Sequence, residues 1–493
     1  MANIITISQK TNNISFFYKN SSTFVIVRSE SSCAYLYHRN NTIQPSKLPK
    51  VKLRKTYLKH LLPILLCCAS GCDANQIAVD TEILVIGGGT SGTIAAIQAA
   101  KANCKTILIE SGSQLGGTIT TGGVSIPGLF HAWGQQIIGG IGWELVKQTV
   151  RMNADSLPDF SIPYGHAHWK HQIPINGYLY ALLSEEMCLN AGVDLHYYET
   201  PTEIAHTKKG WIVKTAGKGS TRIYHAKQLI DCTGDAAAVD LAGFDRIKEE
   251  ETQPGSLIFE LEGYDYSGLE KEAIRQSFDE AIQTGRLLET DAYNGLEALL
   301  NARKGLAAQH VPGADSSTAQ THSAANMEGR KSLLRIVRFV RSLPGCENTR
   351  IKYMAPETAV RETYRINGLY CITLDDYLSG RKFDDALAYS FYPIDLHVSH
   401  GVEPRHLKDS VVATIPLRAL IPKGSKNLIV AGRCISSDRL ANSALRVQAS
   451  CMAMGQAAGA VAAIACKENT TPSNVDLDKV KQLLSIHGAI VPN

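Results

Sequence analysis

The sequence lacks the patterns that mark several large classes of protein. The chain has twelve cysteines, and none of the eight beyond residue 72 belongs to a Cys-x-x-Cys pair, which argues against a zinc ribbon, a thioredoxin-like redox pair and an iron–sulfur cluster. Its 50 basic and 46 acidic residues leave a formal net charge of only +4, and the basic residues are dispersed. Beyond the first 72 residues we find no apolar run long enough to span a bilayer. We therefore expect neither a bound metal nor a nucleic-acid partner.

The N-terminal segment differs from the rest of the chain, which has the composition of a globular protein. Residues 1–50 are rich in Asn, Ser, Thr and Lys without a sustained period. A basic stretch then leads into the apolar run Leu61–Leu66 and the small residues Ala69-Ser70-Gly71-Cys72, which is the pattern of a secretory signal. The last four residues resemble the lipobox of bacterial lipoproteins, whose cysteine is lipidated and begins the mature chain. We expect a signal peptide at 51–72.

Two further expectations follow from this leader. A signal normally begins at the N-terminus, so Val51 is expected to be the true start, and residues 1–50 to be a gene-model extension or disordered. Residues 54–59 resemble the twin-arginine export motif, with Lys55 in place of its second arginine, and ordinary secretion is the alternative route. Either route predicts an exported protein that is lipid-anchored to a bacterial cell-envelope membrane, on the periplasmic or surface side.

A dinucleotide-binding fingerprint begins at residue 87. The strand pattern Thr81–Ile86 leads into Gly-Gly-Gly-Thr-Ser-Gly, an Ala-rich helix pattern follows, and a second strand pattern at 106–109 ends in an acid. The glycines allow a tight turn, close approach to a pyrophosphate and close packing of helix on strand, and the acid can bind the adenosine ribose. The cofactor-binding candidates here are Gly87, Gly89, Thr90, Ser91, Gly92 and Glu110.

Later segments of the sequence distinguish an FAD-binding protein from an NAD-binding one. Leu115-Gly116-Gly117-Thr118 resembles the segment that lies along the FAD pyrophosphate in flavoproteins of the glutathione-reductase superfamily. An NAD-only dehydrogenase, the alternative, would continue its strand–helix alternation at this point. A strand that closes on Asp231-Cys232-Thr233-Gly234-Asp235 resembles the Ala-Thr-Gly return to FAD of the same superfamily, with Cys232 for Ala. A third strand pattern, Asn427–Val430, closes on Ala431-Gly432-Arg433. These motifs add Gly116, Gly117, Thr118, Thr233, Gly234, Asp235, Gly432 and Arg433 to the cofactor-binding candidates.

A long helix is predicted from about Ser443 to Ala465. Its Gly455 and Gly459 give it a small-residue face that can lie close against the sheet. The positive end of its dipole would point at the flavin N1/C2=O edge, where negative charge develops on reduction. Ser443 and Arg446 at this end are further cofactor-binding candidates, and the alternative for Arg446 is a phosphate or structural ion-pair partner.

The chain is similar to the FAD-dependent oxidoreductase family related to the fumarate reductase flavoproteins, over about residues 80–490. The stretches that carry this resemblance are 86–92, 116–123, 137–140, 230–235, 361–368, 392–397, 415–422 and 427–459. At 361–368 the family usually shows Arg-Glu-Thr-Arg-Arg-Ile-x-Gly, whereas this chain has Tyr364 at the fourth position. The resemblance implies FAD as cofactor and redox chemistry, without a substrate.

The expected fold is α/β: a Rossmann-like FAD-binding domain, with a parallel sheet and an antiparallel meander at 194–225, and an inserted α+β cap domain. The FAD-binding domain would comprise 80–245 and, with C-terminal helices, 405–490, and 246–404 would form the cap or substrate domain. Within the cap we predict a strand at Gly255–Glu262, helices at about 266–310 and a mobile loop at 311–328.

Five residues are candidates for catalysis. His131 follows the segment expected under the flavin. Asp395 and His397 lie two apart, so on a strand they share a face, and a proton relay between them is sterically possible. Arg361 and Arg365 could hold a carboxylate or another anion. The alternatives are structural histidines and an internal salt bridge between Arg361 and its neighbour Glu362.

Together these features predict an FAD-dependent oxidoreductase that transfers a hydride between flavin N5 and a small polar or anionic substrate. The alternative is a lipid-anchored, flavin-fold binding subunit of an envelope complex without independent turnover. The sequence identifies neither the substrate, the reaction direction, the electron acceptor nor the oligomeric state.

Overall fold

The computed structural model describes residues 76–162, 167–302, 305–398 and 401–493, together with five short strands in the first 38 residues. The chain divides into two compact units, Met1–Gln76 and Ile77–Asn493. The expected signal peptide at 51–72 lies outside the described residues. The strands of the first unit are β1 (Thr6–Ile7), β2 (Ile14–Ser15), β3 (Phe17–Asn20), β4 (Thr23–Val27) and β5 (Ala34–His38).

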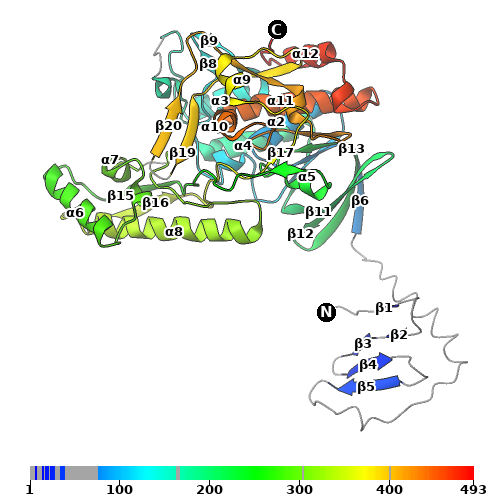
Figure 1. Cartoon of the computed structure of the whole chain (residues 1–493), viewed down its shortest axis with the longest axis horizontal. Coiled ribbons are helices and arrows are strands. Elements are labelled where there is room, and N and C mark those ends of the chain that lie inside the picture. The colour runs from blue at the N-terminus through cyan, green and yellow to red at the C-terminus, as the bar shows by residue number, and fades with distance from the viewer. Residues whose placement is uncertain are drawn as a thin grey trace, which may run out of the picture. The chain divides into compact units, whose positions relative to one another are not determined.

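The second unit contains a seven-stranded sheet, of which β6, β11, β12 and β13 are labelled in Figure 1. Its order is β10-β7-β6-β13-β12-β11, and β22 pairs with β13. The pairs β10–β7, β7–β6 and β13–β22 are parallel, whereas β11, β12 and β13 form an antiparallel meander. The meander predicted at 194–225 was wrong at its start, because residues 194–197 form β10, which is parallel to β7. The strands are β6 (Gln76–Ile86), β7 (Thr106–Glu110), β10 (Asp194–Tyr197), β11 (Glu199–Thr207), β12 (Gly210–Gly217), β13 (Ser220–Asp231) and β22 (Leu428–Val430). The fold is therefore the predicted α/β type with a Rossmann-like FAD-binding domain.

Two helices of the FAD-binding domain, α2 (Thr90–Lys101) and α11 (Gln448–Lys467), pack tightly against each other. A Cβ on Gly455 would overlap the carbonyl oxygen of Ser91, and one on Gly459 would overlap that of Ala95. We had expected the small-residue face of α11 to lie against the sheet. In the structure it lies against α2 instead. The other helices packed around this pair are α3 (Gly140–Met152), α4 (Gly177–Ala191) and α12 (Leu477–Ile486), and α5 (Ala237–Leu241) follows β13.

The predicted long helix at 443–465 is two helices in the structure. Helix α10 (Arg439–Leu445) ends with Arg446 as its C-cap, and α11 begins after Val447, whose backbone is extended. Helix α11 also has the length and composition of a membrane span, so our expectation of no such run was wrong, but its residues are largely buried inside the protein. In the described residues it is a core helix.

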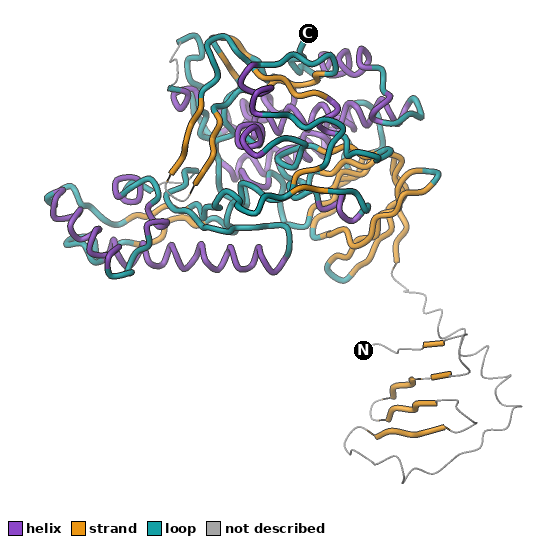
Figure 2. The backbone as a smooth tube through the Cα atoms, viewed as in Figure 1, coloured by secondary structure: helices purple, strands orange, loops and turns teal. Residues whose placement is uncertain are grey.

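The segment expected to form the cap has its own hydrophobic core, within residues 257–355. Strands β15 (Phe259–Glu262) and β16 (Arg350–Met354) pair antiparallel, and helices cover them (Figure 2). The predicted helices between 266 and 310 are α6 (Lys271–Gln283), the 3-10 turn η4 (Glu289–Ala292) and α7 (Leu296–Leu300). The prediction of a mobile loop at 311–328 was wrong beyond residue 318. Helix α8 (Ala319–Arg341) begins at Ala319, and the Thr318 side chain caps its first turn.

The remaining elements are four two-stranded pairs and several short helices. The strand pairs are β14 (Arg246–Ile247) with β17 (Arg365–Ile366), β18 (Ala386–Ser390) with β21 (Ala413–Pro416), β19 (Ile394–Val398) with β20 (Gly401–Arg405), and β8 (His131–Ala132) with β9 (Gln135–Gln136). The helices are α9 (Leu374–Ser379), η2 (Gly117–Ile119), η3 (His168–His171), η5 (Leu417–Leu420) and η6 (Pro472–Asn474). Strand β19 carries Asp395 and His397 to the cap-facing side of the sheet domain.

Candidate functional site

A cavity of about 590 Å³ lies where the carboxyl ends of the central strands meet the cap. Its wall contains residues that directly follow β6, β7, β13 and β22, and residues of the cap segment 357–361. Ligands of α/β proteins bind at the carboxyl ends of parallel strands, and pockets of this volume hold small molecules and cofactors. Most of the predicted site residues line this cavity. The cofactor-binding candidates among them are Gly87, Gly89, Thr90, Ser91, Glu110, Gly117, Thr118, Thr233, Gly234, Asp235, Gly432, Arg433 and Arg446. The catalytic candidates among them are Arg361, Asp395 and His397.

Two glycine loops form the floor of this cavity. Gly87 has φ +96°, a conformation that favours glycine, and a Cβ on Gly92 would overlap the Gly87 carbonyl oxygen. The second loop is hydrogen-bonded to the first, because Gly116 N donates to Gly88 O at 2.9 Å. A Cβ on Gly89 would meet no protein atom within 4 Å, so the backbone there faces open space in the cavity wall. This is the bare backbone that a pyrophosphate requires.

Glu110 ends β7 and is held in place by the backbone. Its Oε2 accepts a hydrogen bond from Gly88 N, and its Oε1 accepts one from Gly112 N, both at 2.6 Å. The carboxylate thereby lies next to the first glycine loop and at the cavity wall. This placement fits the predicted contact with the hydroxyls of an adenosine ribose.

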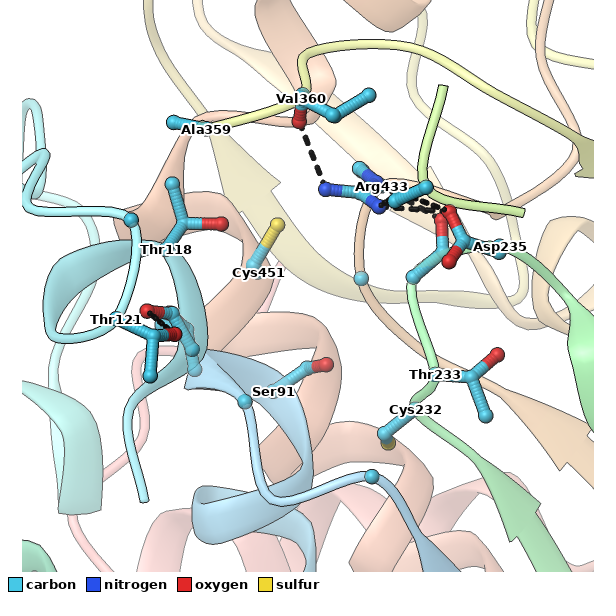
Figure 3. A pocket seen from close by; sticks show the side chains of 18 of the residues that line it. Ser91, Thr118, Thr121, Cys232, Thr233, Asp235, Ala359, Val360, Arg433 and Cys451 are labelled. Carbon is cyan, nitrogen blue, oxygen red and sulfur yellow. Dashed lines mark hydrogen bonds and ion pairs between the residues drawn. The ribbon is translucent and has the colours of Figure 1, made fainter. Parts of the chain in front are cut away.

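Arg433 joins the two later loops to the cap (Figure 3). Its guanidinium donates to Asp235 Oδ1 at 2.7 Å, to Gly234 O at 2.9 Å and to Val360 O at 2.8 Å. Asp235 Oδ1 also accepts from Ser316 Oγ at 2.9 Å and Thr363 Oγ1 at 2.6 Å. Arg433 and Asp235 therefore link the segments around Ser316 and Val360 to the two later loops, and both residues line the cavity.

The junction of α10 and α11 brings polar atoms to the opposite wall. Gln448, in the first turn of α11, donates from Nε2 to Val124 O at 2.9 Å, while its buried Oε1 has no hydrogen-bond partner. Buried polar atoms are normally paired, so Gln448 Oε1 is suited to a donor on a bound group. Ser443 does not reach the cavity wall. Its Oγ accepts from Asp395 N at 3.1 Å and donates to Leu440 O, so it supports β19 from behind.

The residues present fit FAD. A bare glycine backbone and the start of α2 lie where a pyrophosphate is expected, Glu110 lies where a ribose is expected, and Gln448 offers an unpaired acceptor beside the start of α11. These groups line one continuous cavity.

Asp395 and His397 share one face of β19, as predicted. His397 Nε2 lies 3.4 Å from Asp395 Oδ2, and Asp395 Oδ2 also accepts from Arg446 Nη2 at 3.2 Å. The other ring nitrogen, His397 Nδ1, lies 3.0 Å from His310 Nε2. His310 is buried and stacks on Tyr293 with ring centroids 3.5 Å apart. Asp395 and His397 line the cavity, whereas His310 stands behind them.

Burial and positive charge keep both imidazoles neutral. Burial, followed by the charge of Arg361, lowers the pKa of His397 to about 4, although Asp395 opposes this shift. Burial, Arg361 and His397 together lower the pKa of His310 to about 2. Burial alone would raise the pKa of Asp395, but its hydrogen bond with His397 and the charge of Arg446 outweigh it, and the pKa falls below its usual range.

The structure separates the two predicted anion-binding arginines. Arg361 Nη1 donates to Pro254 O at 2.6 Å and Ser256 Oγ at 3.0 Å, and it has no carboxylate within 4.0 Å among the described residues. Arg365 is buried away from the cavity, where it pairs with Glu249 at 2.6 Å and Glu362 at 3.2 Å. The internal salt bridge considered for Arg361 thus belongs to Arg365, and Arg361 alone faces the cavity.

His131 also lies apart from the cavity wall. It stacks on Phe160 with centroids 3.7 Å apart and packs edge-on against Trp143. Burial, and then the nearby His171, lowers the pKa of His131 to about 4. The structure does not bring His131 to Asp395 and His397, and its surroundings match the structural alternative.

Sequence reasoning missed several residues around this site. His310, Tyr293 and Gln253 come from the cap segment, and Gln253 Oε1 accepts from both His397 N at 3.1 Å and Arg446 Nη2 at 3.2 Å. No local motif surrounds them, because they meet β19 only through the folding of the cap. Tyr392, which lines the cavity and accepts a hydrogen bond from Gln172 Nε2 at 2.7 Å, lay inside a stretch already singled out.

Comparison with known proteins identifies the family of the chain. The family model described as FAD dependent oxidoreductase matches residues 82–484. A geranylgeranyl bacteriochlorophyll reductase-like protein from Thermoplasma acidophilum is 13% identical, with a TM-score of 0.39, over 83% of this chain and 82% of that one. The p-nitrophenol 4-monooxygenase from Pseudomonas putida is 12% identical, with a TM-score of 0.35, over 83% and 84% of the two chains. Structural likeness at this level carries no argument about substrate.

Proposed function

Because the chain belongs to the FAD dependent oxidoreductase family, we propose that it transfers a hydride between flavin N5 and a small polar or anionic substrate. The chain is an FAD-dependent oxidoreductase, with FAD as its cofactor. The observation that carries the finer proposal is that one cavity contains both the glycine loops for FAD and the Asp395–His397 pair.

Each part of the cavity has a task in this proposal. Gly89 and the start of α2 would hold the pyrophosphate, Glu110 would hold the ribose, and Gln448 Oε1 would accept a hydrogen bond from the ring system. When bound, FAD supplies the isoalloxazine ring, which exchanges two electrons with the substrate. The cap, held by Arg433 and Asp235, covers the site and limits the access of water.

His397 is the group that we assign to proton transfer. Its Nε2 is on the cavity side, because Asp395 beside it lines the cavity whereas His310 on the Nδ1 side does not. The neutral ring has two tautomers. With the proton on Nε2 it donates to Asp395, and with the proton on Nδ1 it donates to His310 Nε2 and leaves the Nε2 lone pair free to accept a substrate proton. Once Nε2 takes up that proton, Asp395, 3.4 Å away, accepts from the new Nε2–H and stabilises the imidazolium.

The charges around His397 favour an anionic group on the substrate. Arg361 and Arg446 carry two positive charges and Asp395 carries one negative charge, while His397 and His310 are neutral at neutral pH. A cation without a carboxylate partner beside a cavity is favourable only when an anion neutralises it. We therefore assign the anion to Arg361 and place the reacting carbon near His397.

An anaerobic screen of flavin bleaching against sugars, sugar acids and dicarboxylates tests this proposal. With the substrate that bleaches the flavin, His397→Ala should retain FAD and slow flavin reduction roughly 10²–10⁴-fold, the usual contribution of general acid–base catalysis. Asp395→Asn should cost less, because it degrades the orientation and stabilisation of the imidazole without removing the base. Arg361→Gln should mainly raise the half-saturating substrate concentration. Flavin reduction at the wild-type rate in His397→Ala would refute the assignment.

The alternative of a binding subunit without turnover is not supported by the comparisons, and no described feature favours it. The electron acceptor is left open, since no described feature identifies one.

We also propose that the protein is exported and lipid-anchored, on the sequence of residues 51–72 alone. Expression from residue 51 as Met should give a membrane-associated product that takes up radiolabelled fatty acid. Cys72→Ser should abolish the label. Labelling that persists in Cys72→Ser would contradict the proposal, and so would processing only of chains begun at Met1.

A further inference from the structure

A cluster of metal-binding side chains lies on the FAD-binding domain, separate from the residues that line the FAD cavity. Glu82 of β6, Cys104 after α2 and Cys466 at the end of α11 place one carboxylate oxygen and two sulfur atoms within 4.8 Å of one another. The two thiols are buried, with exposed fractions of 5% and 4%, and the Glu82 side chain is 35% exposed. None of the three lines the cavity between sheet and cap.

We propose that Glu82, Cys104 and Cys466 bind a thiophilic divalent cation of the zinc type. Zinc–sulfur bonds of about 2.3 Å and zinc–oxygen bonds of about 2.1 Å at tetrahedral angles place sulfur and oxygen about 3.6 Å apart. Cys466 Sγ lies 3.7 Å from Glu82 Oε1, which matches that spacing. The three residues lie far apart in the sequence, which explains why the absence of Cys-x-x-Cys pairs led us to expect no metal.

The surroundings leave room for a fourth ligand and for the charge of the cation. Lys227 Nζ contacts Glu82 Oε1 at 3.0 Å, but its side chain is 52% exposed and can move into solvent. Glu82 Oε2 accepts a hydrogen bond from Lys105 N at 2.9 Å, which holds the carboxylate in place. Water can complete the coordination on the exposed side of Glu82. Two thiol protons leave when the cation binds, because the ligands are thiolates.

The position of the cluster would allow a bound cation to link helices α2 and α11. Helices α2 and α11 both present their first turns to the FAD cavity and pack through Gly455 and Gly459. Cys104 and Cys466 lie at the opposite ends of these helices. A cation there would tie the two helices together at the end remote from FAD, and would stabilise the domain against unfolding.

Calorimetric titration of the FAD-loaded protein with Zn²⁺, after removal of metal by a chelator, tests the proposal. We expect one bound equivalent and, from titrations in buffers of different ionisation enthalpy, release of about two protons. Zn²⁺ should also raise the unfolding temperature. Cys104→Ser and Cys466→Ser should each weaken binding at least about 100-fold. Cys371→Ser removes an exposed thiol and should bind Zn²⁺ like the wild type.

Three results would overturn the site. In the first, the wild-type protein does not bind Zn²⁺ tightly. In the second, Cys104→Ser binds Zn²⁺ with wild-type affinity. In the third, the purified protein contains a disulfide between Cys104 and Cys466 that prevents Zn²⁺ binding. If the cysteine variants fail to fold, Glu82→Gln replaces them, since it keeps both thiols and should still weaken binding. Wild-type affinity in that variant would exclude the carboxylate.

Discussion

At the scale of single residues, the chemistry depends on the charge state of a few buried groups. His397 and His310 contact each other at 3.0 Å, and burial together with Arg361 keeps them neutral. A neutral imidazole accepts a proton, whereas an imidazolium does not. His397 is therefore a neutral base at neutral pH, and it does not gain a proton when the pH falls through 6.5, the ordinary pKa of histidine.

The pH dependence of flavin reduction follows from this charge state. Because the pKa of His397 is lowered to about 4, the neutral base is fully present above that value and is lost as pH falls through it. We expect the rate of anaerobic flavin reduction to be constant near neutral pH and to fall on the acid side with an apparent pKa near 4. Arg361→Gln should move this acid limb to higher pH, because the Arg361 charge lowers the pKa of His397. Stopped-flow measurements by pH jump would show this, and an unshifted limb near pH 6.5 in the wild type would contradict it.

The sequence predicted single residues unevenly, for a physical reason. The pairing of Asp395 with His397 followed from the two-residue period of a strand, which is a local property. Arg365 pairs with its near neighbour Glu362, but its second carboxylate, Glu249, lies in another part of the chain. The partners of Arg361, Pro254 and Ser256, are also distant in sequence, so the sequence did not show which of the two arginines faces the cavity.

At the scale of elements, the close packing of α2 on α11 positions the cavity floor. Strands, glycine loops and the first helix were predicted correctly because their signals are periodic and contiguous. The break at Arg446–Val447 was missed, since neither residue is Gly or Pro, and it appears only where Gln448 and Ala449 bond to Val124 and Pro127. That break brings Arg446 to Asp395.

A single glycine on α11 tests this packing. Gly459→Val would place a side chain against the Ala95 carbonyl and Gln98, forcing α11 away from α2. We expect a loss of about 1–3 kcal/mol in the free energy of unfolding and a lower FAD content. Ala453→Val adds the same β-branched side chain at a partly exposed position of the same helix and should cost much less. Denaturant unfolding and flavin absorbance measure both effects, and equal stability of the two variants would contradict the packing described here.

At the scale of the whole molecule, the chain brings together five segments that are distant in sequence. Residues of the glycine loops at 87–91 and 117–118, of the returns at 232–235 and 432–433, and of the segment 357–361 line one cavity. The sequence identified the first four, because cofactor loops follow strands in a fixed pattern. How the cap closes on them was not predictable, because Arg433 and Asp235 hold it through backbone carbonyls and hydroxyls that have no local pattern.

The central claim is that this cavity is the FAD site, and Gly89→Val tests it most directly. A Cβ at Gly89 meets no protein atom within 4 Å and its φ of −67° suits any residue, so the variant should fold normally while its side chain fills the space for the pyrophosphate. Gly268→Val, also at an open position but outside the cavity, is the control. Flavin absorbance per mole of purified protein should be lost in Gly89→Val and retained in Gly268→Val. A Gly89→Val protein with full flavin content would contradict the account.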